Sequence, residues 1–161
     1  MTGLHFRPEA ELWPLIDRAF QEHSRTVRTL VQAAAVEHMG ATAVPGSITK
    51  GDLDLLVRVP DGDFAAAVES IGSRYVIHQP ENWTDSFASF KDDSGEVPVD
   101  LQLVVAGSDL DLKFVSLRRL LRDRRDLVER VNELKRLHED GDPDAYVAAK
   151  SELYDRFLRE G

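Results

Sequence analysis

Most of the structural information in this chain lies in residues 37–57, which read EHMGATAVPGSITKGDLDLLV. The stretch follows a short strand-like piece at 36–39, passes through a Gly-, Thr-, Ser- and Pro-rich loop at 40–51, and enters an alternating strand at 52–59. Side chains on a strand alternate between its two faces. The apolar odd positions of the second strand therefore face a core, while Asp52 and Asp54 project together on the opposite face.

A third carboxylate lies on the clearest strand of the sequence, residues 97–105, where the odd positions are again apolar and Asp100 points away from them. If the two strands are neighbours, Asp52, Asp54 and Asp100 converge, and three like charges held together need a neutralising cation. Hard divalent cations choose oxygen ligands. We therefore predict these aspartates as metal ligands and catalytic residues, with Mg²⁺ or Mn²⁺ as cofactor. An isolated Asp-x-Asp, by contrast, is more often ordinary solvated surface.

The loop between the strands carries the features of a phosphate-binding turn. A glycine at position 40 lets the backbone approach a phosphate closely, and free N–H groups at the start of a helical turn favour an anion. Ala41 lies in the same turn, and Thr42 and Ser47 offer hydroxyls beside it. Lys50 is placed to neutralise charge near the loop, although a solvated surface lysine explains it equally well.

The remaining pattern predicts an α+β fold, with residues 1–161 forming a single domain. Apolar residues at helical spacing predict an N-terminal helix over 9–34. The α/β core covers 35–106 and includes a helix at 64–71 and further strands at 75–79 and 83–91. A C-terminal helical pair fills 109–160, and Gly141-Asp142-Pro143 separates its two members.

The composition excludes several classes of function. The 161 residues carry 20 Lys and Arg against 29 Asp and Glu, and no cysteine, so disulfides, thiolate zinc sites and a cysteine nucleophile are ruled out. The net charge of −9 argues against general binding of duplex nucleic acid. No apolar run approaches the roughly 20 residues that cross a bilayer, and residues 1–14 lack the pattern of a secretion signal. We therefore expect a cytoplasmic protein that does not bind membranes.

Positive charge is concentrated in residues 113–136, which hold nine Lys and Arg against four Asp and Glu. Four arginines fall roughly on one helical face of this segment: Arg118, Arg122, Arg125 and Arg136. Guanidinium groups suit bidentate contact with phosphate, so Arg118 and Arg122 are predicted phosphate ligands. A solvated face paired with the acidic residues of the same segment is an equally good explanation.

The order of a small glycine motif, an Asp-x-Asp strand and a third acidic strand resembles the nucleotidyltransferase (polymerase beta-like) superfamily. Within it, residues 37–57 resemble the GrpB family, which typically reads His-x-Gly-Ser-Thr-Ala/Ser-Val-Pro-Gly before a lysine and an aspartate strand. The matching positions are His38, Gly40, Thr42, Val44, Pro45, Gly46, Lys50 and Asp54. The tail adds Leu134-Lys135 and a Tyr-x-x-x-Lys formed by Tyr146 and Lys150.

Three positions depart from the GrpB pattern. Ala41 replaces the serine that usually follows the glycine, which removes a possible phosphate-binding hydroxyl. Asp52 stands where an aliphatic residue is common, and Asp100 with Gln102 replaces a histidine-containing strand. The last two departures complete the acidic triad of the superfamily.

The resemblance implies a nucleotidyltransferase-like mixed β-sheet and a Mg²⁺-dependent transfer of a nucleotidyl group from a nucleoside triphosphate to an unidentified acceptor. Asp52 and Asp54 would hold two divalent ions, and Asp100 would bind one of them and serve as base. The alternative is a non-catalytic nucleotide-binding or scaffold module of the same fold. Activity requires that Asp100 lie beside Asp52 and Asp54 on one face.

Overall fold

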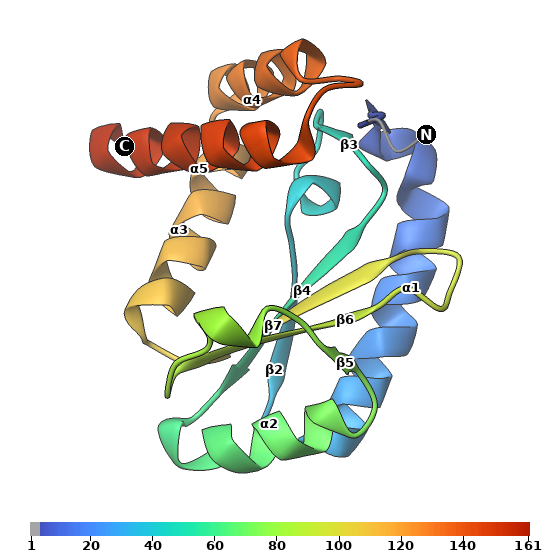
Figure 1. Ribbon diagram of the computed structural model, residues 1–161, viewed down its shortest axis with the longest axis vertical. Coiled ribbons are helices and arrows are strands. Elements are labelled where there is room, and N and C mark those ends of the chain that lie inside the picture. The colour runs from blue at the N-terminus through green and yellow to red at the C-terminus, as the bar shows by residue number, and fades with distance from the viewer. Residues whose placement is uncertain (1–3) are drawn as a thin grey trace.

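The computed structural model describes residues 4–161 and is built around a mixed five-stranded sheet (Figure 1). The strands of this sheet are β2 (Ala35–Met39), β4 (Leu53–Val59), β5 (Val76–Ile77), β6 (Phe87–Asp92) and β7 (Val99–Val105). Their spatial order is β2-β4-β7-β6-β5. β4 and β7 are parallel, and the other pairs are antiparallel. A separate two-stranded ribbon joins β1 (Arg7–Pro8) to β3 (Ile48–Thr49).

Within residues 4–161, five α-helices flank the sheet, which confirms the predicted α+β class (Figure 1). They are α1 (Glu9–Leu30), α2 (Phe64–Gly72), α3 (Asp109–Asp123), α4 (Arg125–Leu137) and α5 (Pro143–Glu160). Short 3₁₀ turns are η1 (Ala41–Ala43), η2 (Asp61–Asp63) and η3 (Pro80–Asn82). Among the described residues, no helix combines the length and the apolar character needed to cross a membrane.

The two faces of the sheet are covered differently. The odd residues of β4, from Leu53 to Val59, are almost completely buried in one core with α1 and α2, as their alternation predicts. On the other face, Leu56 and Val104 pack with Met39 beneath α3. The C-terminal helices share a smaller core of their own with Val44 of the loop that follows β2. The start of β4 and of β7 therefore opens into the space between the sheet and these helices.

Several predicted elements differ from the structure. The strand predicted at 75–79 is reduced to Val76–Ile77, and the strand predicted at 83–91 begins only at Phe87. α1 ends at Leu30, so residues 31–34 lie outside the helix that was predicted to include them. The predicted C-terminal pair is wrong, because Arg124 adopts an extended conformation (φ −122°, ψ 93°) that separates α3 from α4. Neither glycine nor proline marks this break in the sequence. As a consequence, the predicted arginine face is divided between two helices.

A partly buried ion-pair network, with Asp111 at its buried end, connects α3 to the sheet. The Asp111 side chain is fully buried and accepts hydrogen bonds from Arg58 Nε (2.8 Å) and Nη2 (2.9 Å). The Gly107 N–H donates to the same carboxylate at 2.8 Å. Glu37 of β2 accepts from the other side of Arg58 and from Arg118 of α3. Because every charge in the network has a partner, the network tolerates burial.

Candidate active site

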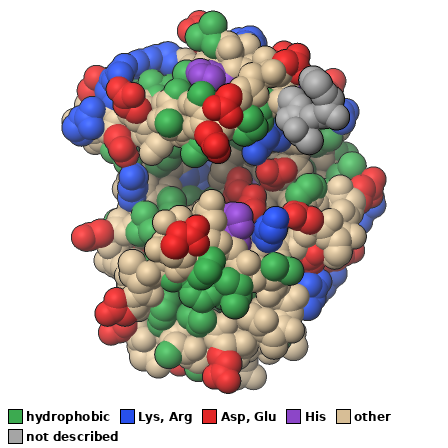
Figure 2. Space-filling view, in the orientation of Figure 1, with side chains coloured by type: hydrophobic (Ala, Val, Ile, Leu, Met, Phe, Trp, Pro, Cys, Tyr) green, Lys and Arg blue, Asp and Glu red, His purple; other side chains and the backbone are tan. Residues whose placement is uncertain are grey.

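The three predicted aspartates line one pocket. Asp54 of β4 and Asp100 of β7 are direct partners in the parallel register, so their side chains leave the same face of the sheet. The predicted adjacency of the two strands is thereby confirmed. Asp52 lies just before β4 and lines the same pocket, which has a volume of about 340 Å³. Figure 2 shows the face hollowed between the C-terminal helices and the rest of the molecule, with acidic and basic side chains inside.

The glycine loop touches the aspartate strand directly. Gly40 has φ 74° and ψ −170°, a conformation that essentially only glycine adopts. A Cβ added there would overlap the Oδ2 atom of Asp54. The missing side chain thus lets the Asp54 carboxyl group lie against the loop backbone. The sequence predicts that a phosphate approaches this glycine, whereas in the structure the group against it is the Asp54 carboxyl.

The predicted phosphate-binding hydroxyls and backbone of the loop are not equally accessible. Ala41 and Ser47 line the pocket together with Gly40. Thr42 is only 2% exposed, and its hydroxyl donates to the backbone oxygen of Asp52. That hydroxyl is therefore engaged within the protein rather than presented to the pocket.

The predicted basic phosphate ligands differ in the groups that they contact. Arg118 lines the pocket, but its guanidinium binds Glu37 and the backbone oxygen of His38. Arg122 donates to the backbone oxygen of Ala43. Lys50 keeps its ammonium at the pocket, 3.6 Å from Asp52 Oδ2. Of the three, Lys50 is the cation that faces the aspartates.

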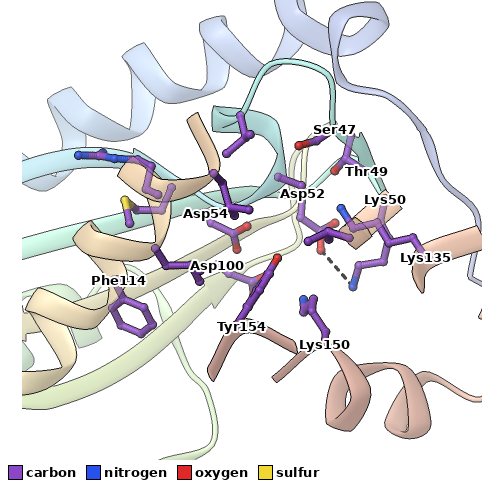
Figure 3. Close-up of a pocket in the computed structure, with 18 of the residues that line it drawn as sticks. Ser47, Thr49, Lys50, Asp52, Asp54, Asp100, Phe114, Lys135, Lys150 and Tyr154 are labelled. Carbon is purple, nitrogen blue, oxygen red and sulfur yellow. Dashed lines mark ion pairs between the residues drawn. The ribbon is translucent and has the colours of Figure 1, made fainter. Parts of the chain in front are cut away.

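Two further lysines reach the pocket from the C-terminal helices (Figure 3). Lys135 of α4 is 3% exposed and donates to the backbone oxygen of Ile48 at 2.5 Å. Lys150 of α5 faces the aspartates. Burial lowers the pKa of its ammonium, and the negative charge of Asp54 opposes this shift. Tyr146 and Tyr154 of α5 complete this wall. Periodicity alone gave no reason to place these helix residues opposite a strand site.

The chain has relatives whose sequences cover nearly all of it. The profile of the family described as GrpB protein matches residues 8–160. The chain belongs to the GrpB family. It is 29% identical to a UPF0157 protein of Vibrio cholerae, over 97% of this chain and 82% of that protein. A UPF0157 protein of Halalkalibacterium halodurans is 27% identical, over 99% and 81% of the two chains.

Solved structures show which fold this GrpB-family chain adopts. The conserved protein GrpB from Enterococcus faecalis superposes with a TM-score of 0.72 at 18% identity, covering 99% of this chain and 97% of that one. The Cid1 poly(U) polymerase, in a crystal structure described as MgGTP-bound, superposes with a TM-score of 0.53 at 12% identity. That match covers 80% of this chain and 42% of the polymerase. The GrpB-family chain thus has a nucleotidyltransferase-like fold, as the resemblance implied.

The Tyr-x-x-x-Lys of the GrpB pattern was the available signal for the helical wall. Its members, Tyr146 and Lys150, stand one helical turn apart and both line the pocket. The Leu-Lys pair of the same pattern supplies Lys135. Lys135, Tyr146 and Lys150, which are isolated matches in the sequence, therefore line the same pocket as the aspartates.

Burial and mutual repulsion shift the protonation of the pocket groups. Burial, followed by the charge of Asp100, raises the pKa of Asp54 from 3.8 to about 7. The pKa of Asp100 is raised by burial and by the charge of Asp52. Burial, followed by the charge of Lys150, lowers the pKa of Lys135 to about 7. Strongly shifted pKa values of this kind cluster at functional sites.

The donor set suits a hard divalent cation in its chemistry. All three acidic groups are carboxylates, the ligands that Mg²⁺ and Mn²⁺ prefer, and no hydrogen bond contributes to the shifted pKa of Asp54 or Asp100. Within residues 4–161, no three acidic or histidine side chains lie close enough together to form a ready-made metal site. Asp52 instead pairs with Lys50, so a cation would take the place of that ammonium.

Proposed function

We propose that this GrpB-family chain is a nucleotidyltransferase that uses Mg²⁺ or Mn²⁺ to transfer a nucleotidyl group from a nucleoside triphosphate to an acceptor hydroxyl. The observation that carries the proposal is the side-by-side register of Asp54 and Asp100 on parallel strands. In this chain, the pair shares its pocket with Asp52 and the Gly40 loop. The Cid1 structure, described as MgGTP-bound, supports a nucleotide as the ligand.

The pocket has an acidic side and a basic side, which suit the cation and the phosphate chain of such a substrate, respectively. Asp52, Asp54 and Asp100 would hold the cation, which supplies charge neutralisation at the reacting phosphate. Lys50, Lys135 and Lys150 would face the phosphate chain, where each ammonium offsets part of its negative charge. A polyanion beside the buried lysines favours their protonated form. Lys135 and Lys150 extend the predicted phosphate contacts of Gly40, Ala41, Ser47 and Lys50.

The chemical step is a displacement at the α-phosphorus. The acceptor hydroxyl forms a new P–O bond, and the bond to the pyrophosphate breaks. The hydroxyl proton passes to the Asp100 carboxylate, which would serve as the general base. Pyrophosphate leaves with its charge offset by the lysines.

Replacing Asp54 or Asp52 by asparagine tests the proposal. The protein would be incubated with Mn²⁺, α-labelled nucleoside triphosphates and cell extract, and label transfer measured. Each substitution removes a charged metal ligand, worth several kcal/mol in the transition state, so we expect transfer to fall by roughly 100-fold or more. Asp61→Asn, an exposed residue at the opposite end of β4, is the matched control.

Two outcomes would contradict the proposal. A wild-type protein that binds neither Mn²⁺ nor any nucleoside triphosphate, and transfers no label, is not a nucleotidyltransferase. Binding of both ligands without transfer in any extract identifies the non-catalytic nucleotide-binding module instead.

The raised pKa of Asp54 predicts a specific dependence of stability on pH. The folded state binds this proton more tightly than the unfolded chain, so ionisation of Asp54 costs folding free energy as the pH rises from about 4 to 7. Asp100 and Asp52 increase that cost, and Lys150 and Lys50 reduce it. In the absence of metal, we expect the melting temperature of Asp54→Asn to rise relative to that of wild type as the pH increases from roughly 5 to 8. Asp61→Asn is the matched control for the substitution itself; a melting-temperature difference between Asp54→Asn and wild type that does not change with pH would refute the assignment.

A further inference from the structure

A buried chain of hydrogen bonds runs from β2 to the start of β4. The Thr42 hydroxyl lies 2.8 Å from His38 Nε2 and 3.2 Å from the backbone oxygen of Asp52. A hydroxyl has one proton, and the Asp52 oxygen can only accept. Thr42 therefore donates to Asp52 and accepts from the Nε2–H of His38. This order fixes the tautomer of His38, with the proton on Nε2.

The surroundings of His38 hold it in this role. Its ring is stacked between Trp13 and Phe20 of α1, with centroid separations of 5.9 and 5.4 Å. Burial, followed by the charges of Arg122 and Arg118, lowers the pKa of His38 to about 4. The imidazole is consequently neutral, oriented by its aromatic neighbours and unable to turn without losing them.

The peptide group after Asp52 is gripped from both sides. Its carbonyl accepts from Thr42, while its N–H, which belongs to Leu53, donates to the backbone oxygen of Pro98 at 2.8 Å. Pro98 comes directly before β7, the strand that carries Asp100. One peptide plane is therefore tied to the glycine loop on one side and to the third acidic strand on the other. Holding this plane restricts the directions in which the Asp52 side chain can leave the backbone.

We infer that His38 and Thr42 are positioning residues, which hold the Asp52–Leu53 peptide so that the Asp52 carboxylate reaches the cation. The inference rests on the proposed function in taking Asp52 as a cation ligand. It assigns the hydroxyl of Thr42 to the aspartate backbone instead of to phosphate. It also gives His38 a purpose that does not require proton transfer to substrate.

Substitutions that separate shape from hydrogen bonding test the inference. Thr42→Val keeps the volume and removes the hydroxyl, whereas Thr42→Ser keeps the hydroxyl. His38→Phe keeps an aromatic ring between Trp13 and Phe20 and removes the donor. We expect Thr42→Val and His38→Phe each to weaken Mn²⁺ binding roughly 10–100-fold, the usual effect of removing an outer partner of a metal ligand. Thr42→Ser should restore most of the affinity, and the double variant should lose little more than either single one.

NMR of the metal-free protein provides a readout independent of metal binding. The ring nitrogens of wild-type His38 should show the Nε2–H tautomer, and Thr42→Val should shift the carbonyl ¹³C signal of Asp52. An Nδ1–H tautomer, or an Asp52 signal unchanged in Thr42→Val, overturns the inference. Equal Mn²⁺ affinity in Thr42→Val and wild type, with both folded, overturns it as well. If the NMR signals behave as expected but wild type binds no Mn²⁺, the positioning stands and the proposed function fails.

Discussion

Gly40→Ala is expected to abolish Mn²⁺ binding and label transfer and to destabilise the fold. The backbone of Gly40 (φ 74°, ψ −170°) costs a residue with a side chain about 1–3 kcal/mol. The added Cβ would also overlap Asp54 Oδ2, so the carboxyl group must leave its place against the loop. Asp54 is the central strand ligand of the proposed site, and its displacement removes a cation ligand without changing any acidic residue.

Melting curves with and without Mn²⁺ measure this effect. A ligand that binds the folded state raises the melting temperature of the wild-type protein in proportion to its binding free energy. We expect Gly40→Ala to melt lower than wild type without metal and to show no rise when Mn²⁺ is added. Gly62→Ala is the matched control, since an added Cβ there meets nothing within 4 Å. A Gly40→Ala protein that keeps the full Mn²⁺ response would show that Asp54 does not need this contact.

The largest effect on stability is expected from Asp111→Ala. The Asp111 carboxylate is fully buried and is paired with two guanidinium nitrogens of Arg58 and with a backbone N–H. Removing one partner of a buried pair leaves the other charge without compensation, which typically costs about 3–5 kcal/mol. Glu37 remains beside Arg58 and keeps the loss toward the lower end of that range. Chemical denaturation of wild type and variant gives the difference directly.

The chain contains a natural control of the same geometry. Arg124 and Asp126 form an equally bidentate pair, with nitrogen–oxygen distances of 2.9 and 2.8 Å, but both side chains are exposed. Exposed pairs contribute little because water competes for both partners. We therefore expect Asp126→Ala to leave the unfolding midpoint unchanged within error. Equal losses in the two variants would mean that burial is not what makes the Asp111 pair valuable.

Local alternation was enough to predict the strand core and the acidic edge. The apolar odd positions of β4 and β7 could only face a core, and this left Asp54 and Asp100 on the opposite face. The register that makes them partners is a long-range property, which the resemblance supplied and periodicity did not. The fold class was predictable because the order of helices and strands and the glycine motif can both be read from the sequence.

The parts that could not be predicted depend on packing between distant segments. The break at Arg124 carries neither glycine nor proline, so nothing local distinguishes it from helix interior. Thr42 appeared to be a loop hydroxyl, and only the approach of Asp52 and His38 shows that it is enclosed. Lys135 and Lys150 sit on amphipathic helices, where their spacing is compatible with a solvated face. Their burial follows from how the helices fold back over the sheet.

The parallel pairing of β4 with β7 makes assembly of the pocket depend on contacts between segments far apart in the sequence. Asp54 and Asp100 come from strands connected by α2, β5 and β6, and Lys150 arrives only with α5. The shortest contiguous fragment that contains the complete set of charges runs from Lys50 to Lys150, which is 101 of the 161 residues. Pairings between distant segments pay the entropy of closing long loops before they gain any contacts, so they form late and slowly. The charges of the pocket are therefore complete only when α5 has packed against the rest of the described structure.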